Sequence, residues 1–247
     1  MSRRLDMSLC ISCTFCGIPG YRISLSIVLG VLDLVTQHVD ALEVLLQGLC
    51  GGLRETIKVH EICLKTGPNL GAVASEVHLC CSLSQPEPVW SVRHVGGAMR
   101  GAGADQLPAL VRPVLEAGIS NNSLRFMYSL GYKLDYEMLR TGFSFQLHKT
   151  VPIAVTITIS VTAVHRLPKI HAVDDPQPVT PGLQMVQVSA PASPDNYSEV
   201  VGAISGLAEY LAPLVHLSKP GVPAGIVPTA STAAAALVSR GGITKVL

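Results

Sequence analysis

The strongest constraint on the fold is a run of strict alternation at residues 152–162, which reads PIAVTITISVT. Its apolar members are Ile153, Val155, Ile157, Ile159 and Val161, and the residues between them are Ala, Thr and Ser. A period of two places these two sets on opposite faces of an extended chain. The run predicts a long strand with one buried and one polar face, as antiparallel sheets and barrels require.

Further strands follow from short apolar runs that are bracketed by turn residues. Residues 55–65 (ETIKVHEICLK) are predicted as a strand with a bulge near His60 and Glu61, because the apolar positions change phase there. Residues 76–83 and 89–95 form a hairpin pattern around QPEP, and LQMVQVSA begins another strand at Leu183. PALVRPVLEAG, which begins at Pro108, contains two prolines, so it is predicted as an edge strand.

Three helices are expected. Residues 36–52 carry an apolar stripe of helical period and end in a pair of glycines. Residues 124–131 form a short helix after a capping Asn122 or Ser123. Residues 193–217 are amphipathic over several turns.

The pattern contains no βαβ unit, so the predicted fold class is mainly β (α+β), an antiparallel β-barrel with a few flanking helices that leaves no strand edge unprotected. Residues 1–34 are expected to be a divergent leader, either disordered or the product of a wrong start exon, in which only IVLGVLDLV at 27–35 could supply a strand. Residues 35–218 form the barrel domain. Residues 219–247, rich in Ala, Gly and Pro, form a disordered tail.

Composition excludes several classes of function. The chain has 18 basic and 17 acidic residues and no basic cluster, so we expect no direct contact with nucleic acid. The apolar run at 23–35 is shorter than the roughly 20 residues that span a bilayer, and Asp33 interrupts it, so we expect no membrane insertion. Seven cysteines, an odd number in a chain of this size, favour reduced thiols in the cytosol or nucleus.

The metal-ligand and phosphate-binding patterns are incomplete. The C-x-x-C-x-x-C run that begins at Cys10 has no fourth ligand nearby. His60 and Cys63 are three residues apart in a predicted strand and should point to opposite faces, and HLCC at 78–81 is predicted as ordinary strand. GGAMRGAGAD at 96–105 lacks the Lys-Ser/Thr of a nucleotide loop and is predicted as a flexible connector. We expect no catalytic residue, no metal and no cofactor.

Six of the eleven aromatic residues lie between Leu124 and Leu147. The four that follow the short helix are Tyr132, Tyr136, Phe143 and Phe145, and we predict that they fill the barrel and its contact with a helix. Because Tyr combines apolar area with a polar tip, we further expect part of this cluster to bind a partner helix.

Three segments carry a resemblance to a known family: DALEVLLQGLCG, LRFMYSLGYKLDYEMLRTGFSF and LAPLVHLSKP. With VHEICLKTGPNLG, PVWSVRHVGGAMRGAGADQ and NYSEV, they resemble subunit 18 of the Mediator of RNA polymerase II transcription, especially its plant form, from Thr36 to Pro220. The resemblance implies a non-catalytic β-barrel subunit of the head module, which relays signals between activators and the RNA polymerase II machinery in the nucleus. Its implied partners are subunit 20, the C-terminal helix of subunit 8 and other head-module subunits.

An enzyme is the alternative. Tunnel-type barrel phosphohydrolases, which are metal-dependent triphosphatases, have a similar architecture, and Lys133, Asp135 and Glu137 alternate along one predicted strand. If all three pointed into a lumen with several more carboxylates, they could hold a metal and a phosphate. The other reading is a solvated outer face, since charged residues are mostly exposed.

Overall fold

The computed structural model describes residues 21–29, 33–35, 38–66, 75–99, 103 and 106–219, with the backbone alone for the first two ranges. Three helices are present in these ranges: α1 (Val39–Cys50), α2 (Ser123–Ser129) and α3 (Tyr197–Leu211). The strands are β1 (Tyr21–Leu29), β2 (Asp33–Val35), β3 (Glu55–Thr66), β4 (Glu76–Ser82), β5 (Val89–Val95), β6 (Leu110–Ile119), β7 (Tyr132–Lys149), β8 (Val155–Arg166), β9 (Gln177–Pro178) and β10 (Leu183–Ala192). The Cys10 motif and the expected tail beyond Lys219 lie outside the described residues.

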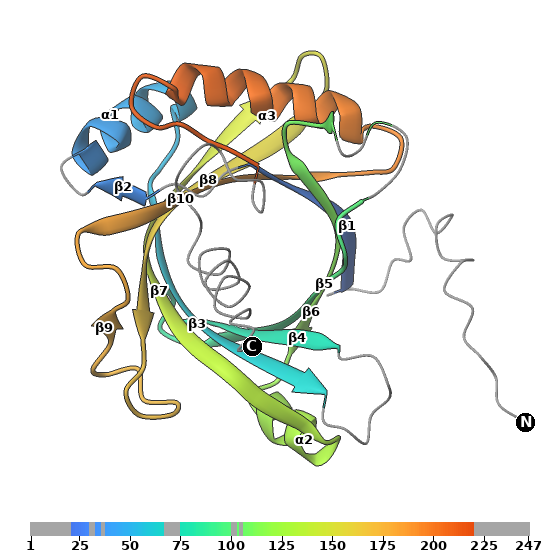
Figure 1. The fold of residues 1–247 in the computed structure, drawn as a ribbon, viewed down its shortest axis with the longest axis vertical. Coiled ribbons are helices and arrows are strands. Elements are labelled where there is room, and N and C mark those ends of the chain that lie inside the picture. Colours follow the sequence, from blue (N-terminus) through green and yellow to red (C-terminus); the bar gives the residue numbers. More distant parts are fainter. Residues whose placement is uncertain are drawn as a thin grey trace, which may run out of the picture.

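The strands form one antiparallel sheet in the order β2-β10-β1-β6-β5-β4-β3-β7-β8-β9. Strand β10 also pairs with β8, so eight of the strands follow one another around a ring, which Figure 1 shows end-on. The β10–β8 ladder covers residues 185–189 of β10, and the β10–β1 ladder covers residues 188–192. The predicted fold class is confirmed, although two short, offset ladders make the barrel looser at β10 than elsewhere.

The main hydrophobic core lies between α1, α3 and one face of the sheet. Leu42 and Leu46 of α1 and Ile204 and Leu207 of α3 are buried in it. The sheet contributes alternate residues, and the most deeply buried of these are Phe145, Ile157, Ile159, Val161, Val186 and Val188. Figure 1 shows both helices outside the ring, so this apolar face is the outer face of the barrel.

A smaller apolar cluster lies under α2, on the opposite side of the ring (Figure 1). It contains the buried Ile62, Leu64 and Leu79, with Leu124 and Met127 of α2 packed against it. The packing of α2 on Ile62 and Leu64 explains why the apolar positions in residues 55–65 change phase. The predicted bulge near His60 is wrong, because the β3–β4 register is regular there and the apolar residues occupy both faces of β3.

Two other expectations need correction. The sheet begins at Tyr21, inside the expected leader, because β1 pairs with both β6 and β10. Strand β6 is not an edge strand but lies between β1 and β5. Pro113 of β6 lies where the ladder between β5 and β6 ends. The Pro113 carbonyl oxygen accepts the Gly96 N–H at 2.8 Å, so the N–H that proline lacks would have formed only the outermost hydrogen bond of this ladder.

Turn residues end two of the helices as the sequence predicts. Gly51 follows α1 with a φ of 58°, and its N–H donates to the Gln47 carbonyl at 3.1 Å. Gly131 follows α2 with a φ of 95°. None of the described helices is long and apolar enough to cross a membrane.

Gly142 lies close to the backbone of β8, and its replacement tests the ladder between β7 and β8. A Cβ at this position would lie 2.0 Å from the Val161 carbonyl oxygen and 2.9 Å from the Thr162 Cα, so backbone must move. We expect Gly142→Ala to lower the free energy of unfolding by about 1–3 kcal/mol or more. Denaturant unfolding measures the loss.

Gly202→Ala is the matched control. Gly202 is exposed on α3 and has open space around it, so Ala should stabilise the helix by about 0.5–1 kcal/mol. Two substitutions of the same kind therefore have opposite predicted signs. Equal effects would contradict the packing described for β7 and β8.

Candidate functional site: the inner face of the barrel

The inner face of the barrel is polar, whereas the outer face is apolar. Along the β7–β8 ladder, Phe143 pairs with Val161 on the outer face, whereas Ser144 pairs with Ser160 on the inner face. The same alternation continues around the ring. It places charged residues of five strands on the inner side, namely Glu61 of β3, Glu76 and His78 of β4, Arg93 of β5, Glu116 of β6 and Arg140 of β7.

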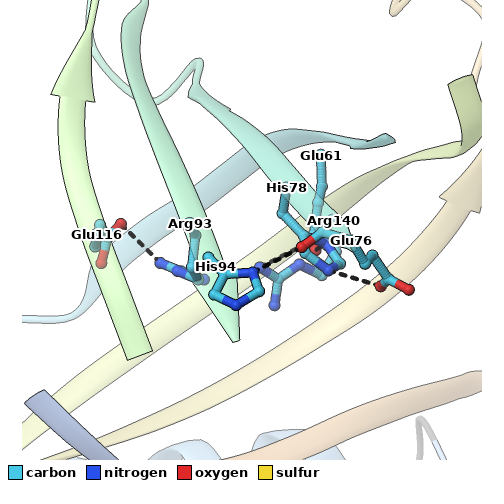
Figure 2. A network of polar contacts seen from close by, with 7 residues as sticks. All are labelled: Glu61, Glu76, His78, Arg93, His94, Glu116 and Arg140. Atoms are coloured by element: carbon cyan, nitrogen blue, oxygen red, sulfur yellow. Dashed lines mark hydrogen bonds and ion pairs between the residues drawn. The ribbon is translucent and has the colours of Figure 1, made fainter. Parts of the chain in front are cut away.

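Glu61 is the centre of this inner network (Figure 2). One of its oxygens lies 2.9 Å from Nδ1 of His78, and the other lies 3.1 Å from a terminal nitrogen of Arg140. The second ring nitrogen of His78, Nε2, lies 2.9 Å from Oε1 of Glu76. His78 therefore bridges two carboxylates.

The network has a second ion pair beside the first. Arg93 donates to Oε1 of Glu116 at 3.0 Å, and the Ser91 hydroxyl donates to the same oxygen at 3.2 Å. Nδ1 of His94 lies 2.9 Å from the Glu76 carbonyl oxygen. With two guanidinium groups facing three carboxylates, a protonated His78 balances the charge of the whole network.

The pKa values follow from these contacts. Burial acts to raise the pKa of Glu61, but the hydrogen bond from His78 and the charge of Arg140 outweigh it, so the pKa is lowered. The hydrogen bond to Glu61 raises the pKa of His78, against the opposing effect of burial. Each partner therefore favours the charged form of the other.

The thiols on the inner face are poor nucleophiles. Burial, and then the charge of Glu76, raises the pKa of Cys63 to about 12, and burial raises the pKa of Cys80 to about 11. A thiol that stays protonated at neutral pH is unreactive. The four described cysteines, Cys50, Cys63, Cys80 and Cys81, are free.

A pocket of about 530 Å³ lies beside the β3–β7 and β3–β4 ladders. Its lining contains one charged side chain, that of Glu55, which accepts hydrogen bonds from Ser144 and Gln146. The remaining lining residues are Thr56, Ile57, Val59, Ser82, Ser84 and Gln85. This lining offers neither a cation for a phosphate group nor several carboxylates for a metal ion.

The structure does not bring the four predicted aromatic residues into one cluster. Phe143 and Phe145 meet edge to face, with ring centroids 5.9 Å apart, and are buried in the main core outside the ring. Tyr132 packs against the smaller cluster under α2. Tyr136 is paired with Cys63 across the inner face and is 42% exposed. The expected contact with helices is present for Tyr132, Phe143 and Phe145, but these three lie outside the ring and do not fill the barrel. The part of all four residues in partner binding stays a prediction.

The three alternating charges of β7 also separate. Strand β7 contains one extra residue, Asp135, where its register against β3 shifts. Asp135 forms an ion pair with Lys65 at 2.6 Å, whereas the Glu137 carboxylate lies 3.0 Å from Nε2 of His60. Since His60 and Glu61 are successive residues of β3, Glu137 lies on the outer side. The arrangement that would favour a phosphohydrolase is not present among the described residues.

The expected separation of His60 and Cys63 onto opposite faces is confirmed. What the sequence did not reveal is that Cys63 faces His78 across the β3–β4 ladder, with Glu76 close to both. Ligand spacing along the chain carries no signal for this group, because strand register brings it together.

These features define the chain as an antiparallel β-barrel protein with helices packed outside and an interior in which acidic and basic side chains pair with one another. Comparisons with known proteins agree. A family described as "Med18 protein" matches residues 87–221. The Mediator of RNA polymerase II transcription subunit 18 of Arabidopsis thaliana is 58% identical over 216 residues, which cover 87% of this chain and 96% of the relative. The protein of the same name from Xenopus tropicalis is 28% identical over 191 residues, covering 76% and 85%.

The fold has a counterpart among solved structures. A chain in the structure of the Schizosaccharomyces pombe Mediator head module matches with a TM-score of 0.60 and 15% identity, covering 80% of this chain and 98% of that chain. The chain belongs to the Med18 family, that of Mediator subunit 18.

Replacing Glu61 tests whether the inner network stabilises the barrel. Its side chain is 12% exposed, so Glu61→Gln leaves Arg140 and His78 poorly compensated in a partly buried setting. We expect the free energy of unfolding at pH 7 to fall by about 1–3 kcal/mol. Glu43→Gln is the control, because its ion pair with Arg54 is more exposed and should contribute less than about 1 kcal/mol. Equal losses would show that the inner network adds no stability of its own.

Proposed function

We propose that this chain acts as subunit 18 of a Mediator head module, a non-catalytic nuclear protein that binds subunit 20 and the C-terminal helix of subunit 8. The observation that carries the proposal is 58% identity over 96% of the length of Arabidopsis Mediator subunit 18. Through those subunits it would relay regulatory signals to the RNA polymerase II machinery. Direct contact with nucleic acid is not part of the proposal, since the chain carries a formal charge of only +1.

The inner face supports a role without catalysis. Its carboxylates Glu61, Glu76 and Glu116 are already bonded to His or Arg, so they are not arranged to chelate a free metal ion beside a phosphate. A catalytic site would require charges that are directed at a substrate rather than at one another.

The outer surface near α2 supports protein binding. Phe126, Tyr128 and Leu130 are exposed by 40% or more on this surface, whereas Tyr136, which is exposed to a similar degree, lies on the inner face. Aromatic side chains of this kind are enriched at protein interfaces. Of the aromatic residues predicted to bind partners, Tyr136 and Tyr132 have accessible surface. Phe143 and Phe145 would act indirectly, by holding β7 in place.

Co-expression tests the assembly. We expect the chain to elute with subunits 20 and 8 as one stable trimer in size-exclusion chromatography, at a mass that matches one copy of each. Omitting subunit 20 should leave the chain less soluble, because an interface of a permanent complex is largely apolar. A chain that remains soluble and monomeric beside both partners would refute the proposal.

Tyr136→Ala tests the partner-binding residues. If the Tyr136 ring is part of the contact, we expect roughly ten-fold weaker binding of subunit 8, which is within the range of an aromatic interface residue. Isothermal titration with the subunit 8 C-terminal peptide measures the change, and a thermal melt shows whether the variant is folded. Tyr210→Ala serves as control, since Tyr210 is 68% exposed on α3 and has no predicted role. Unchanged affinity in a folded Tyr136→Ala variant would exclude this residue.

A further inference from the structure

A second cluster of ligand-type side chains lies on the outer side of β3 and β7. Oε2 of Glu137 lies 3.0 Å from Nε2 of His60 and 3.0 Å from Nδ1 of His171. The three ligand atoms all lie within 4.8 Å of one another. His60 comes from β3, Glu137 from β7, and His171 from the connection between β8 and β9.

The cluster is largely buried, and a backbone hydrogen bond fixes its geometry. The side chains of His60 and Glu137 are only 7% and 6% exposed, and that of His171 is 37% exposed. The other carboxylate oxygen of Glu137, Oε1, accepts the backbone N–H of His171 at 2.7 Å, which fixes the orientation of the carboxylate. His171 has a φ of 62°, a left-handed conformation that residues other than Gly rarely adopt.

The cluster contains one carboxylate and two imidazoles, a donor set that suits a cation. The ion-pair partners of Glu137 in the described part of the chain are imidazoles rather than Lys or Arg. Burial and the Glu137 charge raise the pKa of Tyr128 in α2, so the field of this carboxylate reaches the neighbouring helix. A buried carboxylate of this kind is stabilised by a cation, and a metal ion would supply one.

We propose that His60, Glu137 and His171 bind one divalent transition-metal ion, of which Zn²⁺ fits the donor set best. Two imidazole nitrogens and one carboxylate oxygen form a common three-residue zinc set, with a fourth position left for water or another donor. The backbone bond to Oε1 is the outer contact that such sites use to orient a ligand. Bound metal would tie the segment around His171 to the barrel wall. The inference stands on this geometry and does not depend on the proposed function.

The inner group of Cys63, Glu76 and His78 is the competing location, since its ligand atoms also lie within 4.8 Å of one another. Both ring nitrogens of His78 are already bonded to carboxylates. Arg140 adds a positive charge beside this group. These contacts disfavour a second cation there, so we place the metal on the outer side.

Cobalt and zinc titrations of the full-length protein test the proposal. The test protein is a variant with Cys10→Ser, Cys13→Ser and Cys16→Ser, so that the cysteine motif cannot bind metal. Any bound metal is first removed with a chelator. We expect one Co²⁺ per chain, visible d–d absorption without thiolate charge transfer, and displacement by Zn²⁺. Zinc should also raise the Tm of this background protein.

Variants locate the ion. His171→Ala should weaken zinc binding by at least about ten-fold and abolish the rise in Tm. Glu137→Gln should weaken zinc binding as well, and His148→Ala, at a histidine bonded to Thr156 elsewhere on β7, should leave it unchanged. Absence of stoichiometric binding, unchanged affinity in His171→Ala, or thiolate charge transfer that Cys63→Ser removes would each overturn the proposal.

Discussion

The β7–β8 ladder is the interaction on which the rest of the structure depends. It pairs residues 138–149 with residues 155–166 in one continuous antiparallel register. Its odd-numbered residues, Phe143 and Phe145 on β7 and Ile157, Ile159 and Val161 on β8, provide the surface that α1 and α3 cover. Because the period is two, the same ladder turns hydroxyl and amide groups inward. One alternation therefore decides both where the core lies and why the interior is polar.

Much of this architecture can be read from the sequence, because the alternation is local. Strands β3 to β8 and β10, the three helices and the antiparallel class follow from periods and turn residues, whereas β1 begins at Tyr21, inside the expected leader. The composition of the inner network does not, since Glu61, His78 and Arg140 meet only when β3 has found β4 on one side and β7 on the other. That register is a non-local property, and no spacing along the chain encodes it.

The aromatic segment shows how a single inserted residue changes the faces that a sequence pattern predicts for its side chains. The alternation from Tyr132 to Met138 predicts one face for Tyr132, Leu134 and Tyr136. Asp135 is the extra residue at the register shift, so Leu134 packs beneath α2 whereas Tyr136 lies on the inner face. The same shift sends Glu137 outward to His60, and this is why the chemistry of one short segment is divided between two faces.

A charged interior needs a physical reason, because buried ion pairs contribute little net stability when desolvation is included. Register offers one. A slip of β4 by one residue along β3 would turn His78 to the outer face, away from Glu61 and against the apolar cluster under α2. The same slip would turn the buried Leu79 inward, so the apolar outer face and the inner ion pairs oppose it together. The outer core stabilises the barrel, and the inner ion pairs add a second cost to a wrong register because a slip leaves Glu61 without its partner His78.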